Sequence, residues 1–280
     1  MKKISRRSFL AAAGLSVAAL ALTACGGSSA STASSVASSA AASSEAASTS
    51  AAAGELTTVE AGKLTMATNA TFPPYEMTTD AGEFEGIDIE TAQAIADKLG
   101  LELQIDDMDF DAALLSVQQR KADIVMAGVT VTDERKAVMD FSDSYATGIQ
   151  SIIVPEGSDI ASPDDLAGKK IGTQRGTTGY IYCSDDFGDD SVVAYDDGLT
   201  AVQALNNGQV DAVVIDNAPA KEFVAANPGL VILDTSYAEE DYAIGMAKGS
   251  SLEDAVNAAL EELKADGTLQ SIVDKYITAE

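Results

Sequence analysis

Along the chain from about residue 56, short apolar runs alternate with segments in which apolar residues recur every three or four positions. Residues 64–68 form the first such run, and apolar residues then recur at helical spacing from Ile89 to Leu99, just before Gly100. The run predicts a buried strand, and the spacing predicts an amphipathic helix that ends at the glycine. The folded part of the chain is therefore expected to begin with a strand followed by a helix.

This alternation continues through two further strands. Residues 101–105 predict the second strand, residues 112–120 a helix, and residues 123–126 a third strand. An order of strand, helix, strand, helix and strand implies parallel strands whose faces are covered by helices.

The pattern restarts after residue 162, where Ser162 followed by proline has the features of a helix start. Two β-like runs, residues 152–155 and 242–246, lie between the two blocks. Two blocks favour two α/β lobes, although the pattern alone also allows one larger sheet. The remaining predicted elements are strands at residues 169–174, 192–195, 210–215 and 231–232, helices starting near residues 177, 199 and 217, and final helices near residues 251–264 and 267–278.

Residues 1–24 have the features of a signal peptide: basic residues, then an apolar run too short to span a membrane comfortably, then small residues. The sequence from Leu22 to Cys25, L-T-A-C, resembles the bacterial lipobox, in which the cysteine becomes the lipidated first residue. The paired arginines before Phe9 resemble the twin-arginine export motif, although ordinary signal peptides also carry such pairs. We therefore expect an exported protein that is anchored to the outer face of the cell membrane by lipid on Cys25.

Residues 25–55 form a different kind of segment. After the cysteine they are almost wholly Ser, Ala, Thr and Gly, a composition that cannot bury a core. A flexible coil of this length reaches about 30 Å root-mean-square. We therefore expect a disordered tether between the lipid anchor and the folded part.

The charge balance is strongly acidic, with a formal net charge of −27 at pH 7. Such a surface argues against binding to nucleic acid and against adhesion to anionic lipid. The chain has no histidine, which excludes histidine-dependent catalytic triads and the usual zinc sites, and Cys183 has no partner for an internal disulfide once Cys25 is lipidated. We expect neither a metal nor a cofactor. The acidic clusters lie at residues 106–111, 185–190 and 196–197, and they fit no EF-hand spacing. We interpret them as solvated faces, with a calcium site as the alternative.

The segment from residue 126 to 145 carries the most informative chemistry. A buried-looking strand ends there in small residues with backbone N–H groups, and Thr130 and Arg135 follow at a predicted helix start. Free N–H groups, a hydroxyl and a guanidinium at a strand-to-helix junction together suit a carboxylate. The alternative is that Arg135 pairs with Asp133 or Glu134 on a solvated helix face.

This segment closely resembles the corresponding segment of periplasmic polar amino-acid-binding proteins, such as those for glutamine and histidine, and the spacing A-G-x-T-x-T-x-x-R is matched without a gap. The chain is on this basis identified as a member of bacterial extracellular solute-binding protein family 3. The resemblance implies an α/β fold of two lobes, the periplasmic-binding-protein (Venus flytrap, type II) fold with a two-strand hinge. It implies one lobe of residues 56–147 plus 243–280 and a second lobe of residues 148–242.

The same resemblance implies that Arg135 binds the carboxylate of an amino acid, supported by Ala127, Gly128 and Thr130. It also implies that Asp216, which ends a predicted strand before a helix, holds the α-ammonium group. Asp is a favoured helix N-cap residue as well, so the sequence alone also allows a purely structural role for it.

Three further positions are implied to contact the side chain of the ligand. Asn69 and Phe72 lie in the loop after the first strand, and Phe110 begins a helix after the second. In the family, aromatic residues at two of these positions enclose the ligand side chain, whereas ordinary core packing is the alternative for both. Several relatives carry Asp at the Asn69 position, and Asn keeps the hydrogen bonding without the charge. This difference disfavours a strongly basic ligand.

Residues 172–179 run from a predicted strand into a helix, so their N–H groups can bind an anion. The segment lacks the Gly-Lys-Ser/Thr ending of a P-loop. It resembles the ligand loop of the second lobe in the family, where Gln174, Thr177 and Thr178 match contacting positions.

Together these observations predict a lipid-anchored extracytoplasmic receptor for a polar amino acid, neutral or weakly charged rather than strongly basic. We expect a monomer whose two lobes close around the ligand and which passes it to the permease subunits of an ABC importer. One alternative is an enzyme on the same fold, similar to cyclohexadienyl dehydratase, for which Glu76 is the only candidate acid near the loop. Another is the sensor subunit of a signalling receptor. Of these classes, we expect the binding protein.

Overall fold

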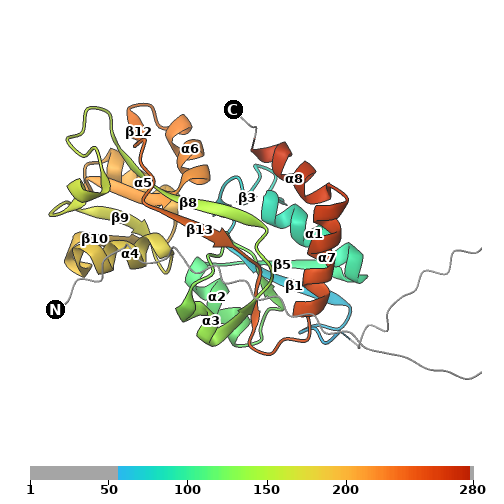
Figure 1. The fold of residues 1–280 in the computed structure, drawn as a ribbon. Coiled ribbons are helices and arrows are strands. Elements are labelled where there is room, and N and C mark those ends of the chain that lie inside the picture. Colours follow the sequence, from blue (N-terminus) through green and yellow to red (C-terminus); the bar gives the residue numbers. More distant parts are fainter. Residues whose placement is uncertain (1–55, 278–280) are drawn as a thin grey trace, which may run out of the picture. The chain divides into compact units, whose positions relative to one another are not determined.

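The structure is a computed structural model that describes residues 56–277 (Figure 1). The predicted signal peptide, the predicted tether and the lipidation site at Cys25 lie outside the described residues and stay predictions. In the part of the chain that is described, no helix combines the length and the apolar character that a membrane span requires.

The first sheet brings the beginning of the described chain together with its later part. The strand at residues 63–68 is parallel to both of its neighbours. The strand at residues 245–247, where the chain returns to this sheet, is antiparallel to both of its neighbours. In order across the sheet the strands are β5 (Glu102–Asp107), β1 (Lys63–Thr68), β6 (Ile124–Val125), β14 (Gly245–Ala247) and β7 (Met139–Phe141). The helices of this part, which we call lobe 1, are α1 (Ile87–Leu99), α2 (Phe110–Gln118), α3 (Asp133–Val138), α7 (Glu253–Ala265) and α8 (Thr268–Tyr276).

The second sheet is formed by the middle of the chain, which we call lobe 2 (Figure 1). In order across the sheet the strands are β10 (Val192–Tyr195), β9 (Ile171–Gln174), β11 (Ala212–Asp216), β8 (Ala146–Pro155) and β12 (Leu230–Ile232), and β13 (Ala238–Tyr242) also pairs with β8. Its helices are α4 (Thr178–Phe187), α5 (Gly198–Asn206) and α6 (Asn217–Ala226).

Two antiparallel strands, β8 and β13, carry the chain between the lobes (Figure 1). Tyr242 of β13 pairs with Ala146 of β8, so the pairing runs to the end of lobe 2 that faces lobe 1. The single β-like run expected at residues 242–246 is divided, because β13 ends in the second sheet at Tyr242 and β14 begins in the first sheet at Gly245. The apolar run at residues 242–246 predicts a single strand, but tertiary packing places its two ends in different sheets.

A small third sheet, which the sequence pattern does not predict, shapes the loop after β1. It consists of β2 (Thr71–Phe72), β3 (Glu76–Thr78) and β4 (Phe84–Glu85), which are too short to show an alternating pattern. Phe72 pairs directly with Glu76 in antiparallel register, so their side chains lie on the same face. Gly86 follows β4 with a φ of 131°, and a Cβ atom there would lie 2.2 Å from the carbonyl oxygen of Tyr75.

Replacing Gly86 with alanine is expected to destabilise the protein by about 3 kcal/mol or more, because the new methyl group meets backbone and the φ angle is unfavourable. For a domain of this size, that loss lowers the Tm by roughly 6–12 °C. The matched control is Gly82→Ala, since Gly82 also has a positive φ, 81°, but no atom near its Cβ position. Equal Tm values for the two variants, measured by circular dichroism, would show that the contact at Gly86 is not restrictive.

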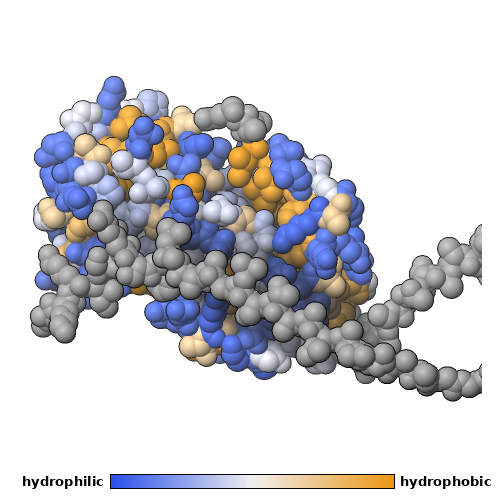
Figure 2. Space-filling view, in the orientation of Figure 1, coloured by the Kyte–Doolittle hydropathy of each residue, from blue (hydrophilic) through white to orange (hydrophobic). Residues whose placement is uncertain are grey.

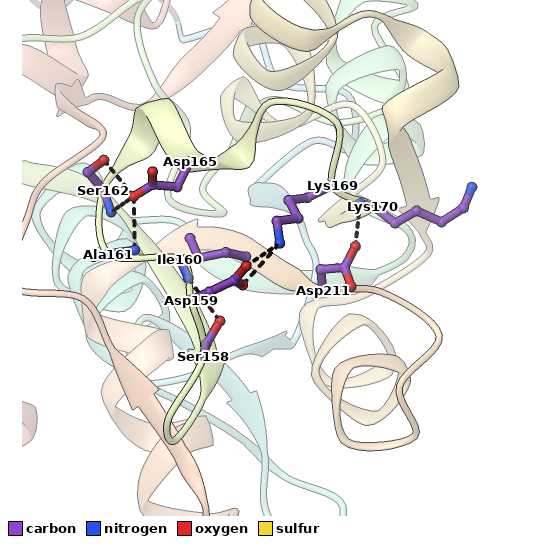
Figure 3. A network of polar contacts seen from close by, with 9 residues as sticks. All are labelled: Ser158, Asp159, Ile160, Ala161, Ser162, Asp165, Lys169, Lys170 and Asp211. Carbon is purple, nitrogen blue, oxygen red and sulfur yellow. Dashed lines mark hydrogen bonds and ion pairs between the residues drawn. The ribbon is translucent and has the colours of Figure 1, made fainter.

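Most of the remaining expected elements form close to their predicted bounds, with one difference after Ser162. The helix expected there is a short 3-10 turn, Pro163–Leu166. It is fixed by Asp165, whose Oδ2 accepts hydrogen bonds of 2.9 Å from both the N–H and the hydroxyl of Ser162 (Figure 3). Lys169 pairs with Asp159 at 3.0 Å in the same loop. These local polar bonds and the single buried side chain of Leu166 hold the segment, which lacks the repeated apolar positions of an amphipathic α-helix.

Each lobe has its own apolar core. In lobe 1 the side chains of Leu64 and Met66 on β1 are fully buried and pack with Ile95 of α1. In lobe 2 the buried side chains of β8, including Ile153, pack with those of α5. Polar residues cover much of the face seen in Figure 2, and hydrophobic residues form scattered patches there. Gly100 ends α1 in the left-handed conformation, with a φ of 69°, as the sequence predicts.

Candidate functional site

A cavity lies between the two lobes and is lined by residues of both. It has about 430 Å³ of space free of atoms, part of which is open to solvent. All of the residues that the sequence nominates for ligand binding line it: Asn69, Phe72, Phe110, Ala127, Gly128, Thr130, Arg135, Gln174, Thr177, Thr178 and Asp216. Five further lining residues are not among those nominated for ligand binding: Glu76, Gln150, Val214, Ile215 and Tyr242. The fold brings the nominated residues together, and their contact with a ligand remains a prediction.

Arg135 turns into this cavity from the first turn of α3. Thr132 caps that helix by accepting a 3.2 Å hydrogen bond from the Arg135 N–H. The guanidinium donates to the carbonyl oxygens of Thr130 at 2.7 Å and of Gly176 at 3.1 Å, and it lies 5.4 Å from the ring centre of Phe110. The side chain is only 9% exposed, so it is not on a solvated helix face. A guanidinium has five N–H donors, and those left over can face a carboxylate in the cavity.

The backbone donor of Gly128 is already used, contrary to the expectation of open N–H groups along this segment. The Gly128 N–H donates a 3.0 Å hydrogen bond to Oδ2 of Asp88, a buried residue of α1. Glycine is required at this position because the φ is 54° and a Cβ atom would lie 2.9 Å from the Phe72 ring. Gly128 therefore shapes the cavity next to Phe72, and only its carbonyl group is left to contact a ligand.

Asp216 combines the two roles that the sequence leaves open. As the N-cap of α6 it accepts a 3.0 Å hydrogen bond from the Ala218 N–H on Oδ1, and it accepts a 2.7 Å bond from the Ile149 N–H on Oδ2. It also lines the cavity and is only 2% exposed. Burial raises the pKa of Asp216 to about 6, although these hydrogen bonds oppose the rise. A cation placed in the cavity would stabilise the ionised form.

Asn69 and Gln174 bond to each other from opposite lobes. The Gln174 side-chain amide donates to Oδ1 of Asn69 at 2.8 Å, and the hydroxyl of Thr71 donates to the same oxygen at 3.0 Å. The Asn69 amide donates to the Met108 carbonyl oxygen at 2.9 Å. Both residues lie at the cavity, but the hydrogen-bonding groups of Asn69 are largely satisfied by the protein itself.

Thr177 and Thr178 line the cavity from the N-terminus of α4 in lobe 2. The Thr177 hydroxyl caps the helix by accepting from the Tyr180 N–H at 3.3 Å. It also donates to the Gln174 carbonyl oxygen at 2.8 Å, so this hydroxyl holds the loop. The Thr178 hydroxyl points instead to a carboxylate on β13, that of Glu240, at 3.0 Å.

Glu240 is the main polar residue near the cavity that the sequence reading misses. Its Oε2 accepts 3.0 Å hydrogen bonds from the hydroxyls of Thr130 in lobe 1 and Thr178 in lobe 2, and from the Gln150 amide. Each hydroxyl has one proton, so with this arrangement neither can also donate to a ligand carboxylate. Glu240 also opposes the lowering of the Arg135 pKa that burial causes. The alternation of β13 gives the signal, since Glu240 shares the face of the buried Tyr242.

A second missed feature is the carboxyl pair of Glu76 and Asp88 at the lobe 1 side of the cavity. Both side chains are fully buried. Asp88 accepts a 2.7 Å hydrogen bond from the Tyr145 hydroxyl as well as the bond from Gly128. Burial raises the pKa of Asp88 to about 6, and burial together with the adjacent Asp88 raises the pKa of Glu76 well above its ordinary value.

Comparison with known proteins covers both lobes. The profile of the family described as bacterial extracellular solute-binding proteins, family 3, matches residues 64–279. The L-cystine-binding protein TcyJ of Escherichia coli (strain K12) is 34% identical over 226 residues, which cover 79% of this chain and 85% of the relative. The solved structure of ArtJ, an arginine-, lysine- and histidine-binding protein of Geobacillus stearothermophilus, matches with a TM-score of 0.75 and 34% identity over 78% of this chain and 96% of that chain. An ancestral arginine-binding protein bound to glutamine matches with a TM-score of 0.74 and 42% identity over 78% of this chain and 99% of that chain.

Proposed function

We propose that this chain, which belongs to family 3 of the bacterial extracellular solute-binding proteins, is an extracytoplasmic receptor that captures a polar amino acid for an ABC importer. The family and the two-lobe fold agree with the expectations from sequence, and the relatives compared above are binding proteins and not enzymes. The proposal concerns the ligand, its binding residues and the partners.

The observation that carries the proposal is the pairing of opposite charges across one buried cavity. Arg135 enters it from lobe 1 and Asp216 from lobe 2. The carboxylate of an amino acid suits the remaining guanidinium donors, and its ammonium suits the Asp216 carboxylate. Only a ligand that carries both charges satisfies both residues, so capture and closure of the lobes are coupled. Several charge-assisted hydrogen bonds, each contributing about 1.5–3 kcal/mol, account for the roughly 8 kcal/mol of micromolar binding.

Aromatic side chains supply the walls for the remainder of the ligand. Phe72 is half-buried and stacks on Tyr75 with ring centres 5.9 Å apart, and the buried Phe110 begins α2 beneath Arg135. The preference for a neutral or weakly charged side chain depends on Asn69 alone. Because the Asn69 amide is bonded to Gln174, Thr71 and Met108, it is a weak discriminator of ligand charge.

The cellular setting of the proposal follows from the sequence. We propose export through the predicted signal peptide, by the twin-arginine route or the general one, and anchoring through lipid on Cys25. Residues 56–147 plus 243–280 and residues 148–242 would then move as two lobes of a monomer about β8 and β13. The closed form would dock on separate permease subunits.

The proposal is tested by the Tm of the purified protein in the presence of each of the common amino acids. A ligand at 100 times its dissociation constant stabilises a protein by about 2.7 kcal/mol, which is a rise of roughly 5–11 °C for a domain of this size. We expect such a rise with one amino acid or a small group of them. If no amino acid raises the Tm, the receptor function is wrong.

A further inference from the structure

Glu240 is a buried carboxylate group on β13, the strand that carries the chain back from lobe 2 toward lobe 1. It is only 5% exposed, whereas its neighbours along the strand, Glu239 and Asp241, are exposed. It does not belong to the residues that line the cavity. A buried charge is costly unless the protein supplies hydrogen bonds to it, so the donors that surround Glu240 indicate what it does.

The donors to Glu240 come from both lobes. Its Oε2 accepts a 3.0 Å hydrogen bond from the Thr130 hydroxyl of lobe 1. The same oxygen accepts 3.0 Å hydrogen bonds from the Thr178 hydroxyl, at the start of α4, and from the Gln150 amide on β8. The Tyr182 hydroxyl of α4 also interacts with this carboxylate. The hydroxyl oxygens of the two threonines lie 3.5 Å apart, so one carboxylate oxygen connects the two lobes directly.

The backbone explains why Thr130 lies next to Glu240. The loop before α3 forms an isolated antiparallel bridge between Thr130 and Tyr242, the last residue of β13. Side chains of residues paired in this way lie on the same face, and so do those of alternate residues along a strand. Thr130 therefore shares a face with Glu240, which lies two positions before Tyr242. The contact joins the lobes at the hinge, and the backbone pairing fixes its position.

The other hydrogen bonds described above between the lobes use groups that face the cavity. The Arg135 guanidinium donates to the Gly176 carbonyl oxygen at 3.1 Å, and the Gln174 amide donates to Oδ1 of Asn69 at 2.8 Å. Because Arg135, Gln174 and Asn69 all line the cavity, an amino acid that enters it competes for these groups. Glu240 does not line the cavity, so its connection between the lobes is compatible with a bound ligand.

We propose that Glu240 is a positioning residue that holds the two lobes together, and that it strengthens the binding of an amino acid without contacting it. A protein whose binding-competent form is stabilised binds its ligand more tightly by the same factor. The effect on affinity rests on the proposed receptor function, whereas the connection between the lobes does not. Because the Thr130 hydroxyl has one proton, the inference assigns this hydroxyl to closure of the lobes and leaves the ligand carboxylate to Arg135 and other donors.

The first experiment measures amide hydrogen exchange of the whole chain by mass spectrometry, without added amino acid. Glu240→Gln keeps the shape of the side chain and removes the charge that strengthens its hydrogen bonds. Residues 127–135 and 174–180 contain cavity-lining residues of lobe 1 and lobe 2. We expect amides of these two segments to exchange about 10- to 100-fold faster in the variant, because the lobes separate more often, and amides of α7 to be unchanged.

The matched control is Glu239→Gln, which makes the same change at an exposed position of the same strand. We expect its exchange to equal that of the unmodified protein. If Glu240→Gln behaves like this control, the connection between the lobes does not depend on Glu240. If exchange becomes faster throughout the chain, α7 included, Glu240 only stabilises the fold. Either result overturns the inference.

The second experiment is a double-mutant cycle of Glu240→Gln with Thr130→Val, which replaces the hydroxyl with a methyl group. The probes for calorimetric titration are L-glutamine, L-arginine and L-cystine, each named for one of the relatives above. For each probe that binds, we expect Glu240→Gln to weaken binding about 10- to 100-fold. The double variant should bind within about threefold of Glu240→Gln, because both changes remove the same hydrogen bond.

Losses that multiply in the double variant would show that the Thr130 hydroxyl contacts the ligand instead, and this result would overturn the inference. If none of the three probes binds the unmodified protein, the exchange measurement alone decides on Glu240, and the Tm screen decides on the receptor function.

Discussion

Replacing Arg135 with alanine is expected to weaken amino-acid binding by about 30- to 4,000-fold, because removal of one partner of a buried, hydrogen-bonded charge pair costs about 2–5 kcal/mol. The guanidinium is buried, and two of its donors already fix its position on the carbonyl oxygens of Thr130 and Gly176. Arg135→Lys keeps the charge but loses the fork geometry, so it should recover only part of the affinity. Calorimetric titration with the amino acid found in the Tm screen measures each loss.

The matched control for this prediction is Arg175→Ala. Arg175 lies in the loop before α4, but its side chain is exposed and pairs with Asp196 at the surface at 3.1 Å. Exposed ion pairs contribute little, so we expect less than about a threefold change in affinity for this variant. Full binding by Arg135→Ala, with an unchanged circular dichroism spectrum, would mean that another group binds the ligand carboxylate.

The second large effect is a loss of binding on acidification through Asp216. Its pKa is raised to about 6 by burial in the empty cavity, and an ammonium group binds its ionised form. Affinity for a ligand with a neutral side chain should therefore be constant above about pH 7 and fall by up to tenfold per pH unit below about pH 6. Asp216→Asn should bind weakly at every pH. Affinity that stays constant from pH 7.5 to pH 4.5 would rule out Asp216 as the partner of the ammonium.

The same pKa values predict how the stability of the empty protein depends on pH. A carboxyl group whose pKa is raised on folding stabilises the protein while it is protonated, fully below the ordinary value of 3.8, and this contribution is lost as the pH rises through about 6. The shift corresponds to about 3 kcal/mol for each of Asp88 and Asp216. The contribution of these residues to the free energy of unfolding thus decreases between pH 4 and pH 7, and ligand should restore the part that belongs to Asp216.

The control for the Asp216 measurements is another helix N-cap. Asp197 caps α5 by accepting a 2.6 Å hydrogen bond from the Thr200 N–H, but it is only partly buried and does not line the cavity. Asp197→Asn should lower the Tm slightly and leave both the affinity and its pH dependence unchanged. A similar loss of binding in the two variants would indicate that capping, and not contact with the ligand, explains the effect of Asp216.

The strands and helices with clear periodicity could be predicted from the sequence. The helix that ends at Gly100 and the parallel strands around β1 follow from apolar spacing and from the positive φ that glycine tolerates. The small sheet of β2, β3 and β4 could not, since two or three residues carry no period. The division of residues 242–246 between two sheets was equally hidden, because this run is apolar throughout and nothing in its pattern marks the crossing.

In the candidate site, too, some residues could be predicted from the sequence and others could not. Arg135 and Asp216 could be predicted because they match the charged positions of the family's binding motif, although an Asp at a helix start also serves as an N-cap. Glu240 does not stand out, since it lies between two exposed acidic residues on a strand that reads as a solvated edge. Glu76 is hidden for a related reason: its burial comes from a hairpin and a helix that fold over it, and not from its own segment.

By itself, the sequence determined the family, the two-lobe α/β class and eleven of the residues that line the cavity, because spacing and residue type can be read without coordinates. The tertiary structure alone decided which polar groups are already engaged and which are not. It gives the Gly128 N–H to Asp88 and the threonine hydroxyls to Glu240, and it pairs the buried carboxyl group of Glu76 with that of Asp88. Those assignments depend on which segments meet in space and exclude water, and the balance of charge that a ligand encounters depends on them in turn.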